Sequence, residues 1–278
     1  MSIAYYNGKF FKFENAVVPL TDRSIFFGDA VYDALIGRRG RLFLDDEHFL
    51  RLIGNARRLD IPFRLSADEL RSISYNVVKR SGLSEYFLYV QVGRTADERA
   101  HAYPDAQGAS LLITVSPFSL PDREKRLKLI STPDNRYGYC DVKTVNLLPA
   151  VLASKRAQRL GCDEAVFVKD GCVTECAHSN VSIIKDGRLI THPNCEKILP
   201  GIAKGRLLRA CAELSVPTEE RPFTLTELFE CDEAIVTSTT KICLAAASLD
   251  GVTIGGKGAP ILEKLRDFLF AEYTNWTM

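Results

Sequence analysis

A lysine stands in this sequence at a position where it could perform carbonyl chemistry. Lys143 lies between an aromatic, glycine-containing loop at residues 137–139 and an apolar stretch that begins at Leu147. A lysine at such a loop-to-helix transition can lose its water shell, which lowers its pKa and makes the amine a nucleophile. Taken alone, however, the pattern is more typical of a solvated surface lysine.

Three further patterns could bind a charged, heterocyclic ligand. Glu175 lies among β-rich segments and is followed by small residues, so that its carboxylate could face a bound ring. The turn Pro200-Gly201 opens into an apolar helical stretch, whose first backbone N–H groups would form an anion site. Four consecutive hydroxyl residues at 237–240 could donate to a phosphate. Each pattern also has an ordinary interpretation, as a turn glutamate, a common helix start or a polar turn.

The common signatures of metal, hydrolase and nucleotide sites are missing from the sequence. None of the four histidines forms an H-x-x-x-H pair, and the eight cysteines contain no C-x-x-C pair. The G-x-S-x-G, P-loop and G-x-G-x-x-G patterns do not occur. We therefore expect no metal, and we expect the cysteines to be free thiols of a reducing, cytoplasmic protein.

Composition indicates an ordinary soluble globular protein. The 278 residues include 36 Lys and Arg against 35 Asp and Glu, and 46% are hydrophobic. This balance argues against nucleic-acid binding, because no excess of basic charge is available for phosphates. The first residues do not resemble a secretion signal, and no apolar run is long enough to predict a membrane-spanning helix.

Strands and helices alternate irregularly along the chain, which predicts an α+β fold. Asn7-Gly8 between two short β-rich runs is a strong hairpin signal. Ser66 with Glu69 predicts a capping box at the start of a helix over residues 66–80. The proline-containing stretch 117–122 is the best linker candidate, so we expect a smaller domain over residues 1–118 and a larger one over 119–278.

Together, these patterns resemble the fold-type IV pyridoxal-phosphate (PLP) aminotransferases in both order and spacing. The resemblance extends from residue 6 to about residue 240. It implies that PLP is the cofactor, that Lys143 is the catalytic residue bonded to it, and that Glu175 contacts the pyridine nitrogen. The other cofactor-binding residues that it implies are Arg51, Asn180, Ile202, Ala203, Ser238 and Thr239.

Within that family, two segments most resemble the D-amino-acid transaminases. They are Gly28-Asp29-Ala30-Val31-Tyr32-Asp33 and an R-x-H segment that contains Arg99 and His101. The resemblance implies that Tyr32, Arg99 and His101 bind the substrate α-carboxylate, and that Arg99 and His101 reach in from the partner subunit of a homodimer. A planar guanidinium and a hydroxyl suit a carboxylate chemically.

The implied reaction transfers the amino group of a D-alanine type of amino acid to 2-oxoglutarate, giving a 2-oxo acid and D-glutamate. A branched-chain L-amino-acid aminotransferase, an aminodeoxychorismate lyase and a non-catalytic PLP-binding protein remain alternatives. Two residues depart from the family pattern: His178 stands where small residues are usual, and Ala203 replaces a hydroxyl residue. His178 could change the hydrogen bonding near the cofactor, and Ala203 could weaken phosphate binding.

Overall fold

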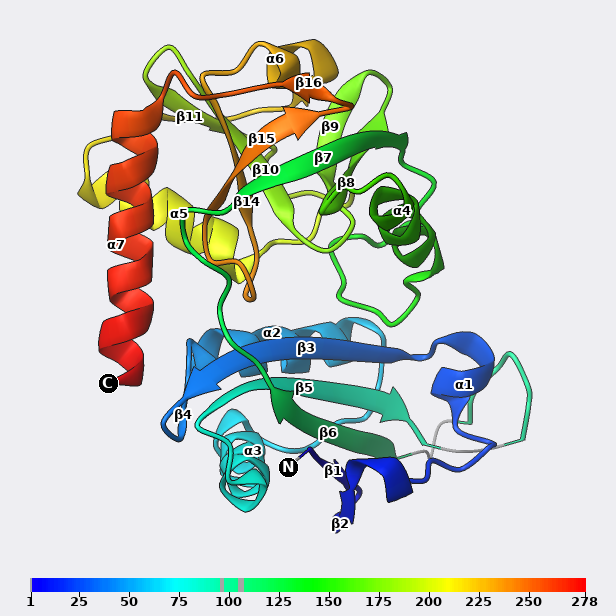
Figure 1. Ribbon diagram of the computed structural model, residues 1–278. Coiled ribbons are helices and arrows are strands. Elements are labelled where there is room, and N and C mark those ends of the chain that lie inside the picture. Colours follow the sequence, from blue (N-terminus) through cyan, green and yellow to red (C-terminus); the bar gives the residue numbers. More distant parts are fainter. Residues whose placement is uncertain (1, 96–97, 105–107) are drawn as a thin grey trace. The chain divides into compact units, whose positions relative to one another are not determined.

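The computed structural model describes residues 2–95, 98–104 and 108–278, which form two compact units (Figure 1). The first unit contains Met1–Ser119, Val142–Asn146 and Asn275–Met278, and the second contains Leu120–Asp141 and Leu147–Thr274. The change of unit after Ser119 lies inside the proline-containing stretch. Lys143 belongs to the first unit by its contacts, because its neighbour Val142 is part of that unit's hydrophobic core. Residues 96 and 97, within the R-x-H segment, lie outside the described residues.

A six-stranded antiparallel sheet forms the centre of the first unit. The hairpin predicted at Asn7-Gly8 is confirmed, since β1 pairs with β2 and both turn residues have positive φ angles. In spatial order the strands are β2 (Lys9–Lys12), β1 (Ile3–Tyr6), β6 (Ala109–Pro117), β5 (Glu85–Arg94), β3 (Ala30–Arg38) and β4 (Arg41–Leu42).

Two long helices, α2 (Asp45–Arg58) and α3 (Ala67–Ser81), cover one face of this sheet (Figure 1). The predicted capping box is present at α3, where Ser66 and Glu69 bond each other's backbone N–H groups. Sequence reasoning missed the short helices η1 (Phe13–Asn15) and α1 (Arg23–Phe27). Because α1 is only five residues long, its apolar periodicity is too short to recognise.

A larger mixed sheet forms the second unit. The pairs β7–β8, β7–β15 and β11–β12 are parallel, and the remaining pairs are antiparallel. In order the strands are β12 (Thr218–Glu220), β11 (Arg188–Thr191), β10 (Asn180–Lys185), β14 (Glu233–Thr237), β15 (Leu244–Leu249), β7 (Arg126–Pro133), β8 (Glu164–Lys169), β9 (Cys172–Cys176) and β13 (Phe223–Thr224), with β16 (Val252–Thr253) pairing to β15.

Helices α4 (Leu148–Arg159), α5 (Ile202–Glu213) and α6 (Leu225–Phe229) pack on this sheet, and α7 (Ala259–Thr277) is the last helix. The antiparallel pairing of β10 with β14 matters for function. It sets Asn180 opposite Thr237, so that the turn before β10 and the turn after β14 meet at one end of the sheet. The turn after β14 contains Ser238 and Thr239, and the turn before β10 lies between Glu175 and Asn180.

Among the described residues, no helix is both long and apolar enough to cross a membrane. The same part of the chain contains no group of three or more side chains placed to hold a metal ion. All eight cysteines are free thiols. Burial raises the pKa of the Cys211, Cys231 and Cys243 thiols to about 12, which makes these three poor nucleophiles at neutral pH.

Candidate active site

The predicted site residues divide between the two units. The first unit contains Tyr32, Arg51, Arg99, His101 and Lys143, and the second contains Glu175, Asn180, Ile202, Ala203, Ser238 and Thr239. Each unit therefore supplies a chemically distinct set of groups.

Lys143 is held against the start of β3 by its own backbone. Its carbonyl accepts a hydrogen bond from the N–H of Tyr32 at 2.9 Å, and the N–H of Val145 donates to Ala30 O at 3.2 Å. Thr144 forms an isolated β-bridge with Val31. The lysine is therefore placed by strand-like pairing rather than by a mobile loop, as a covalent or proton-transferring amine requires.

The Lys143 amine lies over an aromatic surface. Its Nζ is 4.4 Å from the ring centroid of Tyr32, which stacks on Tyr89 at 5.3 Å. Side chains alternate along a strand, so these rings lie on the face of the sheet that α2 and α3 leave open. Burial, and the neighbouring Tyr32, raise the pKa of Tyr89. The two rings thus give Lys143 a partly apolar environment.

Arg51 is oriented by a buried carboxylate. Its Nε and Nη2 donate to the two oxygens of Asp33, each at 2.9 Å, in a bidentate pair. His48, one turn earlier on α2, lies 2.7 Å from Asp33 through Nδ1. Burial raises the pKa of Asp33, but Arg51 and His48 outweigh it and hold that pKa well below its usual range. One carboxylate therefore serves two bases.

Sequence reasoning identified Arg51 but missed Asp33 and His48. A signal was available, because an aspartate inside an otherwise apolar strand needs a cationic partner. His48 and Arg51 are spaced i, i+3, which places them on one face of a helix.

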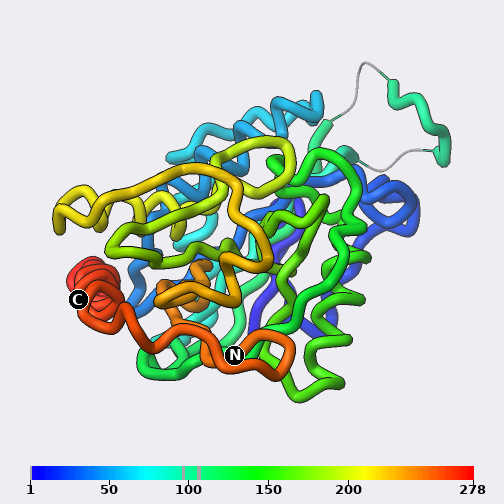
Figure 2. The backbone as a smooth tube through the Cα atoms, turned by 90° about the horizontal axis from the view of Figure 1, so that it is seen from above, coloured from blue at the N-terminus to red at the C-terminus, as the bar shows by residue number. Residues whose placement is uncertain are grey.

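The segment that contains Arg99 and His101 is tied to its unit through Arg23. The Arg23 guanidinium donates to the carbonyls of Ala100 at 2.7 Å and His101 at 3.2 Å, and also to Asp29 at 2.8 Å. Figure 2 shows this segment extending beyond the ends of β5 and β6.

The side chains of this segment are exposed, and they contact α1. The Arg99 guanidinium lies 5.3 Å from the Phe27 ring centroid, and the His101 ring is 5.4 Å from the same ring. A fixed backbone thus presents an arginine and a histidine outward.

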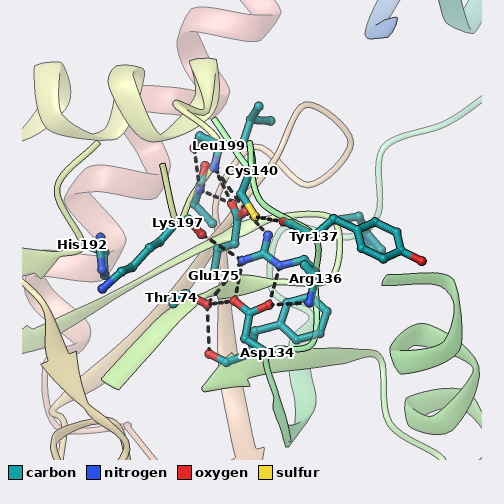
Figure 3. A network of polar contacts seen from close by, with 12 residues as sticks. Asp134, Arg136, Tyr137, Cys140, Thr174, Glu175, His192, Lys197 and Leu199 are labelled. Atoms are coloured by element: carbon teal, nitrogen blue, oxygen red, sulfur yellow. Dashed lines mark hydrogen bonds and ion pairs between the residues drawn. The ribbon is translucent and has the colours of Figure 1, made fainter. Parts of the chain in front are cut away.

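Glu175, in the second unit, is buried and accepts hydrogen bonds on both oxygens (Figure 3). Leu199 N–H lies 3.1 Å from each oxygen, and the Asn180 amide donates to Oε2 at 2.9 Å. Arg136 donates to Oε1. These are all donors, as an ionised carboxylate requires.

Arg136 is a third residue that sequence reasoning missed. Its guanidinium bonds Asp134 and Glu175, donates to Lys197 O at 2.9 Å, and lies 4.6 Å from the Phe167 ring centroid (Figure 3). Burial lowers the pKa of Arg136, but its two carboxylate partners outweigh this effect, and the pKa is raised overall. One cation is therefore shared between two carboxylates. No sequence pattern marks this arginine, since it is 39 residues from Glu175.

Asn180 links Glu175 to the start of α5. Its amide donates to Leu199 O at 3.0 Å as well as to Glu175. A Cβ at Gly201 would lie 1.9 Å from Asn180 Oδ1, so only glycine fits at the N-cap of this helix. No side chain of the described residues caps α5, which leaves the first N–H groups, at Ile202 and Ala203, for an anion.

Hydroxyl groups lie at the end of β14. Ser238 Oγ is 3.3 Å from Thr240 Oγ1, and Ser238 and Thr239 are partly exposed. The buried Thr237 hydroxyl has no hydrogen-bond partner among the described residues. Buried hydroxyls normally have one. The second unit thus offers hydroxyl and backbone donors for a phosphate and, at Glu175, an acceptor for a protonated nitrogen. PLP contains both groups, so the residues present fit it.

Comparison with known proteins agrees with this chemistry. The profile of the Amino-transferase class IV family matches residues 30–249. The chain is 34% identical over 265 residues to a D-alanine aminotransferase of Listeria monocytogenes, covering 93% of this chain and 92% of the relative. It is 35% identical over 257 residues to the D-alanine aminotransferase of Bacillus licheniformis, covering 92% and 90% of the two chains.

Solved structures share the fold at lower sequence identity. The branched-chain amino acid aminotransferase of Escherichia coli superposes with a TM-score of 0.89 at 22% identity, covering 100% of this chain and 96% of that one. The PLP form of the enzyme from Thermobaculum terrenum gives a TM-score of 0.83 at 22% identity, covering 99% and 96%. These likenesses confirm the predicted α+β, fold-type IV architecture.

Proposed function

Because the chain belongs to the class IV aminotransferases, we propose that it transfers the amino group of a D-alanine type of amino acid to 2-oxoglutarate, yielding a 2-oxo acid and D-glutamate. The observation that carries this proposal is the 34–35% identity to two D-alanine aminotransferases over more than nine-tenths of the chain. The exposed, anchored pair Arg99 and His101 supports it further.

Class IV aminotransferases use PLP, and the arrangement of this chain's residues fits that group. When bound, PLP supplies an electron sink for the bond being broken at Cα. We infer that Lys143 bonds to the cofactor and that Arg51 and the start of α5 hold its phosphate, together with Ser238 and Thr239. Glu175 would accept a hydrogen bond from the pyridine N–H.

The chain's own groups then divide the work. The Lys143 amine would take the proton from Cα and return it, because its position against β3 keeps the amine fixed. Glu175 stabilises positive charge on the pyridine nitrogen, and Arg136 and Asn180 hold its carboxylate in place.

Arg99, His101 and Tyr32 would bind the α-carboxylate. Selectivity for the D-enantiomer follows from this assignment, because the group that binds the carboxylate decides which face of Cα meets Lys143. Arg99 and His101 would act in the partner's site of a homodimer, which their exposure supports. The free thiols suit the cytoplasm that we propose as the location.

A panel of D- and L-amino donors with 2-oxoglutarate tests the reaction. D-alanine should give pyruvate and D-glutamate, the protein should be yellow, and borohydride should attach the cofactor to Lys143. Activity with L-leucine or L-valine alone would instead identify a branched-chain enzyme. Pyruvate release from aminodeoxychorismate without a 2-oxo acid would identify a lyase. A colourless protein that takes up no PLP would refute the assignment.

Arg99→Ala tests the carboxylate site separately. We expect KM for D-alanine to rise steeply while the absorption spectrum of the bound cofactor stays unchanged, since Arg99 is assigned to the substrate alone. Arg64→Ala is a matched control, because Arg64 is also an exposed arginine of the first unit. Equal KM values for the two variants would contradict the assignment of Arg99.

A further inference from the structure

The exposed segment 98–104, which contains Arg99 and His101, has no regular secondary structure. Within it, the Ala100 N–H donates to Glu98 O at 2.8 Å and so holds the peptide group that follows Arg99. Exposed segments with few backbone hydrogen bonds open locally at little cost in free energy. Long exposed side chains also lose entropy when they are held in one place. A defined position for Arg99 and His101 therefore depends on contacts with the rest of the first unit.

A buried arginine at the start of α1 makes the closest of these contacts with the backbone. Arg23 is 3% exposed, and its two terminal nitrogens donate to the carbonyls of Ala100 at 2.7 Å and His101 at 3.2 Å. A guanidinium only donates and a carbonyl only accepts, so the direction of both bonds is certain. The two carbonyls belong to the peptide groups on either side of the His101 Cα. Together, the bonds fix the direction in which the His101 side chain leaves the backbone.

Arg23 is itself held by a carboxylate that it shares with a second buried arginine. The Nε atoms of Arg23 and Arg94 donate to the same oxygen of Asp29, at 2.8 Å and 3.0 Å. Arg94, the last residue of β5, is 2% exposed, and it also donates to the carbonyls of Leu59 and Asp60, each at 2.7 Å. The anchor of the exposed segment is therefore bonded to the end of β5 and to the residues that follow α2.

One aromatic ring of α1 lies against both the anchor and the side chains that it presents. The Phe27 ring centroid is 4.6 Å from the Arg23 guanidinium and 5.3 Å from that of Arg99. The His101 ring is 5.4 Å from the same centroid. Attraction between a guanidinium and an aromatic face restricts where the Arg99 side chain lies. Backbone and side-chain contacts thus restrain Arg99 and His101 together.

We propose that Arg23 is a positioning residue for the substrate α-carboxylate site, because its bonds to the backbone hold Arg99 and His101 in place. This role rests on the proposed function, in which those two side chains bind the α-carboxylate. Arg23 does not touch the substrate itself, since its guanidinium is buried and each of its three nitrogens donates to another group of the protein. All the groups involved belong to the first unit.

Binding of a simple carboxylate to the holoenzyme tests this role. Propionate has a carboxylate and no amino group, so its dissociation constant, measured by titration of the cofactor's absorbance, does not depend on which enantiomer the enzyme uses. For Arg23→Met we expect this constant to rise roughly 10- to 100-fold, because small displacements of binding groups have effects of this size. The dissociation constant of PLP should change less than about threefold, since none of the partners described for Arg23 is assigned to PLP. The variant should fold, because Asp29 keeps Arg94 as its partner.

The same substitution in a chain that lacks both presented side chains shows how Arg23 acts. In the double variant Arg99→Ala/His101→Ala, adding Arg23→Met should change the propionate constant less than about threefold, because the groups that Arg23 positions are already gone. Arg23→Lys keeps a positive charge beside Asp29 but lacks the planar fork that reaches both carbonyls. Its propionate constant should lie between those of the wild type and Arg23→Met.

Arg266→Met is a matched control in the second unit. Arg266 is 5% exposed, and it also donates to a backbone carbonyl, Arg123 O at 3.1 Å, and to a carboxylate, that of Glu124. Its removal should lower the free energy of unfolding as Arg23→Met does, because a buried set of hydrogen bonds is lost in each. The propionate constant of Arg266→Met should stay at the wild-type value.

Three results would overturn the proposal, and they can be told apart. If Arg99→Ala raised the propionate constant and Arg23→Met did not, the α-carboxylate assignment would stand and the positioning role would fall. If Arg23→Met weakened propionate equally with and without Arg99 and His101, or no more than Arg266→Met, Arg23 would act through stability alone. If Arg99→Ala left the constant unchanged, the proposed α-carboxylate site itself would be wrong.

Discussion

The two units each contain a buried ionic network, and the two networks are built in opposite ways. In the first unit, one carboxylate, Asp33, is shared by two bases, His48 and Arg51. In the second unit, one guanidinium, Arg136, is shared by two carboxylates, Asp134 and Glu175. The first arrangement orients Arg51 through a bidentate pair, and the second leaves two carboxylates for one guanidinium, which favours an added cation near Glu175.

This difference teaches how a sequence with almost no net charge can bind a ligand of mixed charge. The chain has a formal net charge of +1, so no global field attracts the ligand. The charges are instead paired unequally in two places, and burial strengthens each local imbalance. Glu175 of the second network suits a protonated ring nitrogen, and the phosphate is assigned to Arg51 together with the donors at the start of α5 and at Ser238 and Thr239.

Removing the shared carboxylate should have the largest effect on stability. For Asp33→Asn we expect the free energy of unfolding to fall by about 3–5 kcal/mol, because the largely buried Arg51 guanidinium loses its counter-ion and the buried His48 ring loses its carboxylate partner. Asp134→Asn is the matched variant of the second unit. We expect it to lower the free energy of unfolding by less, because Arg136 still has Glu175 as a carboxylate partner. Urea denaturation would measure the free energy of unfolding of both variants. Equal losses would contradict the proposed difference between the two networks.

Removing the charge of Glu175 should affect the reaction more than the fold. We expect Glu175→Gln to lower kcat by roughly 10²–10³-fold, since the carboxylate that stabilises the ring nitrogen becomes neutral. Asp134→Asn, in the same network but assigned no ligand contact, should lower kcat less than about tenfold. Steady-state kinetics with saturating PLP would measure both. If Asp134→Asn matched Glu175→Gln, the network would act as a whole rather than through Glu175.

Acid should weaken the first network through Asp33. The pKa of Asp33 is lower in the folded protein than the unfolded value of about 3.9, so the folded state binds fewer protons. Its contribution to stability is complete above about pH 4 and is lost as the pH falls toward the folded-state pKa. Denaturation between pH 3 and pH 7 should therefore show a fall at the acid end that Asp33→Asn reduces. An unchanged acid slope in this variant would contradict the assignment.

The smallest effects should be the same in both units. Each unit has a helix with a capping box, formed by Ser66 and Glu69 at α3 and by Thr224 and Glu227 at α6. Ser66→Ala and Thr224→Ala should each lower stability by about 1 kcal/mol, because each leaves a helix N–H without its acceptor. Thr226→Ala, at an exposed position inside α6, is the control and should cost nothing. Thermal denaturation would measure the loss of stability in each variant. Equal losses would show that the two capping boxes contribute alike, in contrast to the two ionic networks.

Local sequence signals predicted much of the fold correctly. The hairpin at Asn7-Gly8 and the capping box at Ser66 follow from the preferences of a few adjacent residues, and both are present. The helical stretch predicted after Pro200-Gly201 is found as α5, Ile202–Glu213. The short helix α1 was missed, because its cap at Asp22 and its end at Gly28 enclose too few residues for a periodic pattern.

The candidate site could be predicted where a single residue type or a local backbone turn carries the chemistry. Lys143, Glu175 and the Pro200-Gly201 turn were identified from their local patterns and from the resemblance to a family. Their roles as a site remain predictions, tested by the variants above. Asp33, His48 and Arg136 were missed because each acts through a partner distant in sequence, 15 to 39 residues away.

The sequence by itself determined the family, the type of cofactor and the residues able to do the chemistry, because these depend on residue identity and spacing along the chain. The tertiary structure alone decided how the charges are shared. Asp33 became the partner of two bases and Arg136 the partner of two carboxylates through contacts between separate strands, helices and loops. Such contacts depend on strand register and helix packing, which bring together residues that no local pattern relates.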